Sequence, residues 1–308
     1  MKIGFVAPGD LGRPTGGDIY DRRLIESLRS AGDEVTLLKA PPAVAEAAYD
    51  VLIEDALYQP SFIFLNQRLK VRRRLPIIGL VHYLRSCDGG NPVYRIADGA
   101  FLNSLDGFIF NSEATGRDVE RLLGRPQPAV VAWPGGDRLP AGLTEEEVAG
   151  RARAAGPLKV LFAGQTIRRK GLHCLNEALA GVPRERWDLQ VASSLNDEQL
   201  AAAYRASQVL VVPSYYEPAG LVYLEALNFG LPVIGTARGG LGEIVAHGRE
   251  GFLIKPGDLG ALRRHLEVMI NNRNFLLAMS LRAWGRRGSL PTWGANGKLV
   301  RNFLAALC

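Results

Sequence analysis

The chain of 308 residues is 47% hydrophobic and carries three cysteines and a formal net charge of +6, a composition that predicts one or two globular domains with an ample core. No apolar run approaches the ~18 residues of a membrane span, and a strand pattern follows the first two residues at once, so the sequence predicts no membrane helix, no signal peptide and a cytoplasmic location. The cysteines are scattered and odd in number, which argues against a disulfide framework or a zinc site and fits a reducing compartment.

The first predicted elements make half of a Rossmann-like domain. A strand at residues 2–8 leads through a long loop into a helix at 17–31, and a second strand follows at 34–38. The loop lacks Gly-x-Gly-x-x-Gly spacing, so we predict no nicotinamide or flavin site. Gly16 and Gly17 open the helix. Without Cβ atoms they let a ligand approach the backbone closely, or they serve only the turn.

A basic stretch ends the next predicted helix, which covers residues 62–74 after a strand at 49–54. Its cations are Arg68, Lys70, Arg72, Arg73 and Arg74, with Leu69 and Val71 between them. Such a stretch could lie on an anionic membrane surface or bind an acidic acceptor. The alternative is a solvated helix end whose cations are favoured by the helix dipole. Because no aromatic residue lies within the stretch, we predict no nucleic-acid partner.

One histidine stands where a ligand site is expected in the first half. The apolar strand at residues 76–81 delivers His82 to its carboxyl end, the edge at which open parallel sheets bind ligands. There His82 could hydrogen-bond a sugar hydroxyl and stabilise developing anionic charge, or it could be a packing residue. The other three histidines have no partners at metal-ligand spacing, so we predict no metal site.

The remaining elements divide the chain into two halves with the same alternation of strands and helices. Helices are predicted at residues 92–104 and 111–123, and strands at 107–110 and 129–132. Residues 141–157 are rich in Glu, Ala, Gly and Arg and predict a linker. We therefore expect a first domain at residues 1–140 and a second at 158–290.

Two glutamates flank the start of one helix in the second half. The apolar run at residues 209–213 predicts a buried strand, and a helix begins near Ala219 and ends before Gly230. Glu217 lies in the loop and Glu225 two turns into the helix. A phosphate over the free N–H groups between them, with hydroxyls at either side, would fit a nucleotide sugar. Alternatively, both glutamates are ordinary surface charges.

This pair resembles the Glu-x7-Glu motif of family four of the retaining glycosyltransferases, which have the GT-B fold. The resemblance continues through residues 235–245, 248–254 and 256–258, and upstream through 160–172. In the family an Arg usually follows the glycine of the phosphate motif, whereas Gln165 stands there in this chain. The resemblance therefore implies that Lys170 holds the diphosphate, helped by Arg168 or Arg169. Residues 1–140 carry as many acidic as basic side chains, so the net positive charge lies beyond them.

The resemblance implies an α/β protein of two Rossmann-like doubly wound domains that face each other across a cleft, with the terminal helix at 293–308 packing back on the first domain. It also implies a role for each site residue. Glu225 would bind the ribose, Glu217 the donor sugar, and Lys170 with the amides of Gly220 and Leu221 the leaving phosphate. The remaining family positions are His82, expected near the sugar, and the pair Gly16 and Gly17, expected near the donor phosphate and the acceptor.

The implied reaction is transfer of a sugar from a nucleoside diphosphate sugar, favoured as UDP- or GDP-sugar, with retention and without a cofactor or metal. The sequence contains no Asp-x-Asp motif. The acceptor would be a lipid, a polysaccharide or a small molecule, and contact with an anionic membrane would place the protein at the inner membrane face. Two alternatives stay open. One is a nucleotide-sugar epimerase or hydrolase on the same fold, and the other is a non-catalytic binding protein, which Gln165 keeps in consideration.

Overall fold

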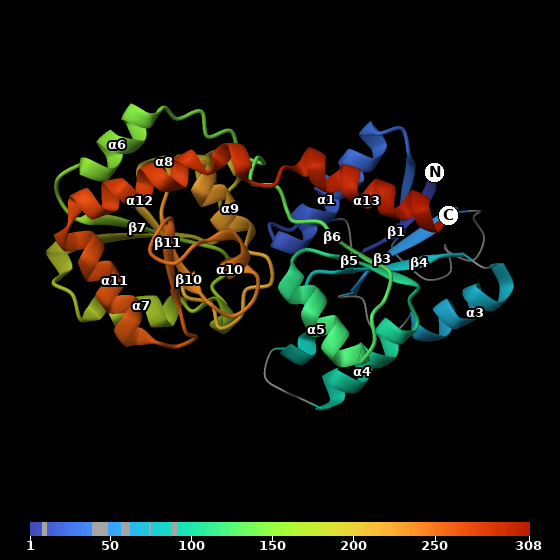
Figure 1. Ribbon diagram of the computed structural model, residues 1–308. Coiled ribbons are helices and arrows are strands. Elements are labelled where there is room, and N and C mark those ends of the chain that lie inside the picture. Colours follow the sequence, from blue (N-terminus) through green and yellow to red (C-terminus); the bar gives the residue numbers. More distant parts are fainter. Residues whose placement is uncertain (8–10, 39–48, 57–61, 74, 88–91) are drawn as a thin grey trace. The chain divides into compact units, whose positions relative to one another are not determined.

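The computed structural model describes residues 1–7, 11–38, 49–56, 62–73, 75–87 and 92–308 (Figure 1). The chain forms two compact units. Unit 1 consists of Met1–Pro134 and Thr292–Cys308, and unit 2 of Gly135–Pro291. Within the described ranges, no helix combines the length and the apolar character needed to cross a membrane.

Unit 1 is built on a parallel sheet of six strands in the order β2-β1-β3-β4-β5-β6. The strands are β1 (Lys2–Val6), β2 (Glu34–Leu38), β3 (Val51–Asp55), β4 (Ile77–Val81), β5 (Gly107–Phe110) and β6 (Ala129–Val131). Its helices are α1 (Gly16–Ser30), α3 (Ile63–Arg73), α4 (Pro92–Asn103), α5 (Glu113–Leu123) and α13 (Trp293–Leu307). In β3, β4 and β5 every residue is buried, because helices cover both faces of such a sheet.

Unit 2 contains a parallel sheet of five strands in the order β11-β10-β9-β7-β8. These are β7 (Leu158–Ala163), β8 (Trp187–Ala192), β9 (Val209–Val212), β10 (Val233–Thr236) and β11 (Gly251–Ile254). The helices are α6 (Glu145–Arg153), α7 (Leu172–Ala180), α8 (Asp197–Ala206), α9 (Leu221–Asn228), α10 (Leu241–Ile244), α11 (Leu259–Asn271) and α12 (Arg273–Gly285). The strand order reverses at β7, so the loops after β7 and β9 leave the carboxyl edge at a switch point, where open α/β sheets bind ligands.

The segment at residues 141–157, predicted as a linker, contains a helix of unit 2. α6 begins with a capping box, in which Thr144 Oγ1 accepts from Glu147 N and the Glu147 carboxylate accepts from Thr144 N. Val148 and Ala152 are buried, and Arg151 donates to the carbonyls of Phe229 and Gly230, both at 2.8 Å. The Glu- and Arg-rich composition hid these two apolar positions one turn apart. The capping box was the local signal for a helix.

Helix α13 at the C-terminus lies beside α1 within unit 1 (Figure 1). The approach is close, because a Cβ placed on Gly297 would lie 1.8 Å from Ser27 Oγ. Arg301 forms an ion pair with the buried Asp33 at 2.8 Å, and Asp33 also accepts from the N-terminal amine at 2.9 Å. The two ends of the chain are thereby joined through one carboxylate.

Candidate functional site

The switch point of unit 2 brings Lys170 and Glu217 together. Lys170 follows β7 and Glu217 follows β9, and the Lys170 ammonium contacts both carboxylate oxygens of Glu217 at 2.7 and 3.0 Å. Ser214 Oγ donates to the same carboxylate at 3.0 Å. The Glu217 residue is 5% exposed, and the Lys170 side chain keeps 15% of its surface accessible. The two predicted donor residues therefore form one nearly buried ion pair at the expected edge of the sheet.

The loop that carries Glu217 is bonded to the segment after β10. Glu217 N donates to Arg238 O at 3.1 Å, and Gly240 N donates to Glu217 O at 2.9 Å. Gly239 lies between these two contacts with a φ of 109°, a region that side chains rarely adopt. A Cβ on Gly239 would lie 2.0 Å from Glu217 O. Only glycine therefore fits against the backbone that positions Glu217.

Replacing Gly239 by alanine is expected to lower the free energy of unfolding by about 2 to 3 kcal/mol, because the added methyl group overlaps a backbone oxygen. Gly248 is a matched control, since its φ is 80° and a Cβ there meets nothing within 4 Å. Gly248→Ala is expected to cost about 1 kcal/mol through backbone conformation alone. Urea unfolding compares the two variants. Equal losses would show that the contact with Glu217 contributes nothing.

The helix between the two glutamates begins at Leu221, directly after Gly220. Gly220 has a φ of 74°, and its carbonyl accepts from Tyr223 N at 3.0 Å. A Cβ on Gly220 would lie 2.6 Å from the Tyr223 ring, so the left-handed turn and the close packing both require glycine. The first N–H groups of α9 have no partner within the helix, and they carry the positive end of its dipole.

Glu225 is completely buried, and both of its carboxylate oxygens are hydrogen-bonded. Arg138 Nε donates to Oε1 at 2.6 Å, and Tyr204 Oη donates to Oε2 at 2.9 Å. Arg138 also forms an ion pair with Asp197. Burial raises the pKa of Glu225, against the opposing effects of Arg138 and Tyr204. The sequence analysis missed Arg138, because it lies 87 residues from Glu225 in the chain and belongs to no motif that we used.

Arg168 and Arg169 lie on the same short 3-10 turn as Lys170, before α7, and Gln165 lies in the loop leading to that turn. Arg168 and Gln165 are exposed. Arg169 is partly buried and donates to Tyr216 O at 3.2 Å, while its own carbonyl accepts from Tyr215 N at 2.8 Å. Arg169 thus supports the loop that carries Glu217, and Arg168 is an exposed cation beside the site.

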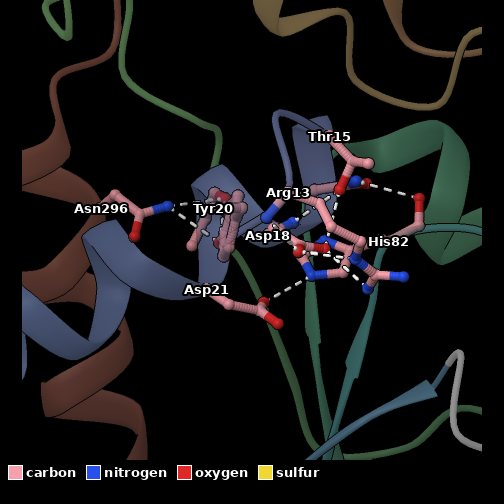
Figure 2. Close-up of polar contacts among 9 residues, drawn as sticks. Arg13, Thr15, Asp18, Tyr20, Asp21, His82 and Asn296 are labelled. Atoms are coloured by element: carbon pink, nitrogen blue, oxygen red, sulfur yellow. Dashed lines mark hydrogen bonds and ion pairs between the residues drawn. The ribbon is translucent and has the colours of Figure 1, made fainter. Parts of the chain in front are cut away.

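In unit 1, His82 is buried at the carboxyl end of β4 against the first turns of α1 (Figure 2). Its Nε2 lies 2.7 Å from Asp21 Oδ1, and a Cβ on Gly17 would lie 3.4 Å from the ring. Gly16 has no such neighbour within 4 Å. Burial lowers the pKa of His82, but the Asp21 carboxylate, with smaller contributions from Asp55 and Asp18, raises it, and the net effect is a raised pKa. The structure therefore brings Gly17 and His82 together and adds Asp21, which the sequence analysis missed.

Tyr20 connects the His82 ring to the C-terminal helix α13. The Tyr20 ring packs edge-on against His82 with centroids 5.0 Å apart and against Trp293 at 5.5 Å. Tyr20 Oη donates to Ala132 O at 2.7 Å and accepts from Asn296 Nδ2 at 2.9 Å (Figure 2). Residues on α13 therefore fix the ring that packs against His82.

Asp21, Asp55 and His82 have oxygen and nitrogen atoms within 4.8 Å of one another. The contact of 2.7 Å between His82 Nε2 and Asp21 Oδ1 has the length of a hydrogen bond between charged groups. We therefore interpret these two residues as a hydrogen-bonded ion pair with a neighbouring carboxylate.

The basic stretch lies on α3 and just beyond it. Leu69 is buried and Arg68 is exposed, so the helix keeps one face in the core. The side chains of Lys70, Arg72 and Arg73, and all of Arg74, lie outside the described residues. Phe64 is 82% exposed one helical turn before Arg68, on the same face.

Residues 186–286 match the family of glycosyl transferases group 1. A D-inositol 3-phosphate glycosyltransferase of Nocardia farcinica is 26% identical over 283 residues, which cover 77% of this chain and 62% of that protein. A protein of the same description from Corynebacterium urealyticum is 30% identical over 241 residues, covering 65% of this chain and 57% of its own. The chain therefore spans less than two thirds of the length of these relatives.

Solved structures share the fold over the whole chain. Sucrose-phosphate synthase from Thermosynechococcus elongatus aligns with a TM-score of 0.79 at 20% identity, covering 99% of both chains. HepE of Anabaena, in complex with UDP-glucose, aligns with a TM-score of 0.78 at 17% identity, covering 99% of this chain and 100% of that chain. The predicted α/β architecture of the GT-B type, with two doubly wound parallel sheets, is confirmed.

Proposed function

Because the chain belongs to the group 1 glycosyl transferases, we propose that it transfers a sugar from a nucleoside diphosphate sugar to an acceptor hydroxyl. The observation that carries the proposal is the Lys170–Glu217 pair at the switch point of unit 2, beside the N-terminus of α9. A cation, unpaired amides and a carboxylate in one place match a diphosphate joined to a sugar with free hydroxyls. UDP is the first nucleoside diphosphate to test, because HepE is described in complex with UDP-glucose.

Each residue of the site has a part in this proposal. Lys170 turns from Glu217 to the diphosphate and, with the amides after Gly220, stabilises the charge that grows on the leaving phosphate. Glu217, no longer paired, accepts hydrogen bonds from the hydroxyls of the donor sugar. Arg168 is the exposed cation that meets the diphosphate from the other side and compensates for Gln165. In unit 1, Gly17 and His82 are the residues proposed to contact the substrate.

We propose retention of configuration by substitution on one face of the sugar. The bond between the anomeric carbon and the diphosphate oxygen breaks, and the acceptor oxygen bonds to the same carbon from the same side. The acceptor's proton passes to an oxygen of the departing diphosphate. No covalent enzyme intermediate is needed, and Lys170 with the end of α9 provides the positive charge that a metal ion provides elsewhere.

Glu225 is proposed to bind the ribose hydroxyls. Its contacts with Arg138 and Tyr204 limit how the ribose can reach it. Both oxygens already accept from Arg138 and Tyr204, but each carboxylate oxygen can accept a second hydrogen bond. Because Glu225 is wholly buried, the ribose must displace or shift the Arg138 side chain to reach it. Glu225→Gln is expected to weaken donor binding by about 1.5 to 3 kcal/mol, the scale of hydrogen bonds to a charged group.

Thermal unfolding with nucleoside diphosphates tests the donor site. The protein is heated with UDP, GDP, ADP or TDP, each with magnesium and with chelator, and a ligand at about a hundred times its dissociation constant adds about 2.7 kcal/mol. A shift that persists in chelator supports the metal-free site and identifies the base. Glu225→Gln should reduce the shift, and the exposed Glu185→Ala, in the same unit, should leave it unchanged. No shift with any diphosphate would contradict the proposal.

Two residues on α3 favour an acceptor that lies at a membrane surface. Phe64 and Arg68 lie one turn apart on its exposed face, an aromatic ring and a cation of the kind that binds anionic bilayers. We expect Phe64→Ser to reduce binding to vesicles containing anionic lipid several-fold. The matched control Leu299→Ser replaces another exposed apolar residue, on α13, and should bind as the native protein does. Equal vesicle binding by the native protein and Phe64→Ser would contradict the proposed contact of α3 with the membrane.

A further inference from the structure

His82 is held by a carboxylate from a different element. Asp21, on the second turn of α1, is fully buried, and its Oδ1 lies 2.7 Å from His82 Nε2. Asp21 Oδ2 is buried and has no hydrogen-bond partner among the described residues. The proton on His82 Nε2 is therefore the donor that this part of the structure provides to the Asp21 carboxylate, and neither group can leave the contact without an unpaired charge in the core.

Other charges around the ring act in the same direction. Asp55, at the end of β3, is 2% exposed and also raises the pKa of His82, as does Asp18 on α1 to a smaller extent. The charge of Asp18 is largely compensated, because Arg13 binds it at 2.9 and 3.0 Å and Thr15 at 2.8 Å. The positive end of the α1 dipole opposes a cation here, whereas the buried carboxylates of Asp21 and Asp55 favour one.

We propose that Asp21 is a positioning residue that holds His82 by Nε2 and keeps its ring protonated, so that Nδ1 presents a proton to the substrate. A neutral His82 with its proton on Nε2 would offer Nδ1 only as an acceptor, whereas the imidazolium offers Nδ1–H as a donor. The contact with Asp21 therefore decides whether His82 Nδ1 donates a hydrogen bond to a sugar oxygen or can only accept one. This inference rests on the proposed role of His82 in the transfer.

Asp21 also bears on the residue that follows His82. The resemblance to the family implies an aspartate directly after the histidine, and this chain has Tyr83 there. Asp21 lies 61 residues earlier in the chain, yet its carboxylate reaches the ring from the facing helix. A carboxylate is thus present beside His82, supplied by α1 in place of the next residue of the strand.

The test is an NMR pH titration of the four histidine rings in the full-length protein, with His82 identified by the signals missing from His82→Gln. In the native protein we expect the pKa of His82 to lie above the ordinary histidine value of about 6.5. In Asp21→Asn the His82 midpoint should move to lower pH, because burial then acts with less opposition. Chelator should leave the His82 signals unchanged.

The matched control is Asp33→Asn, which removes another buried and ion-paired aspartate from unit 1, away from His82. Its His82 midpoint should equal that of the native protein. An unchanged midpoint in folded Asp21→Asn overturns the inference. If Asp21→Asn does not fold, the native protein still decides, because a His82 midpoint at or below the ordinary histidine pKa of about 6.5 overturns the inference as well. His82 signals that change with chelator would identify a bound cation, and they would also overturn the inference.

Activity separates this inference from the proposed function. In the native protein kcat/KM is expected to fall as pH rises through the His82 midpoint, and in Asp21→Asn that fall should begin at lower pH. If His82→Gln keeps full turnover, the proposed role of His82 fails, while the titration result for Asp21 is unaffected. If turnover depends on His82 but the midpoint does not depend on Asp21, the proposed function stands and the inference fails.

Discussion

Lys170→Ala is expected to lower turnover by about 10² to 10³-fold, the effect of removing one preorganised charge that stabilises a developing anion. In the proposed reaction, negative charge grows on the diphosphate oxygen beside Lys170, so the loss should appear mainly in kcat and less in donor affinity. Initial rates at saturating donor and a separate measurement of donor binding distinguish the two effects. The melting temperature of the variant checks the fold, because the nearly buried Glu217 carboxylate loses its cation and keeps the hydrogen bond from Ser214 Oγ.

Arg168→Ala is the matched comparison for Lys170→Ala. Arg168 lies on the same short turn but is exposed, so its removal should weaken diphosphate binding modestly and leave the chemical step nearly intact. Loss of turnover in Arg168→Ala with none in Lys170→Ala would reverse the assignment of the two residues.

Arg138→Met is expected to destabilise unit 2 by about 3 to 5 kcal/mol, because it leaves the Glu225 carboxylate buried without its cation. Arg138 has a side chain that is 4% exposed and Glu225 has none exposed, so solvent screens the pair very little. Urea unfolding measures the loss. Because burial raises the pKa of Glu225, and removal of Arg138 raises it further, the loss should shrink as pH falls and the carboxyl group becomes neutral.

Two further variants test that explanation. Arg138→Met combined with Glu225→Gln removes both charges, and it should be more stable than Arg138→Met alone. The exposed Arg249→Ala, in the same unit, should change stability by less than about 0.5 kcal/mol. A loss below about 1 kcal/mol in Arg138→Met would show that Glu225 is already neutral or reaches water when the cation is removed.

Both carboxylates of the glutamate pair are neutralised by a cation of the chain itself. Lys170 forms an ion pair with Glu217, and Arg138 forms an ion pair with Glu225. In the proposed reaction the diphosphate replaces Glu217 as the anionic partner of Lys170, and hydroxyls of the donor provide hydrogen-bond donors for the carboxylates. The buried polar groups of the site therefore have hydrogen-bond partners both before and after donor binding.

Local patterns in the sequence were sufficient to place most strands and helices. Runs such as residues 77–81 and 209–212 are apolar throughout because parallel strands are covered on both faces, and this signal survives without any knowledge of neighbours. The family resemblance rested on motifs of this local kind, residues 186–286 match the family of glycosyl transferases group 1, and the fold class is confirmed. The same reasoning overlooked α6, where only two buried residues mark a helix in a polar segment.

The sequence alone also proposed Lys170, Glu217, Glu225 and His82. His82 directly follows a strand at the edge where parallel strands end, and the other three rested on the family resemblance. It could not provide their partners. Asp21 meets His82 across 61 residues, and Arg138 meets Glu225 across 87. Spacing along a chain predicts neighbours on one helix or strand, but which side chains meet from different elements depends on how those elements pack. Charge state, burial and orientation at this site were therefore decided by the tertiary structure, since each depends on groups distant in sequence.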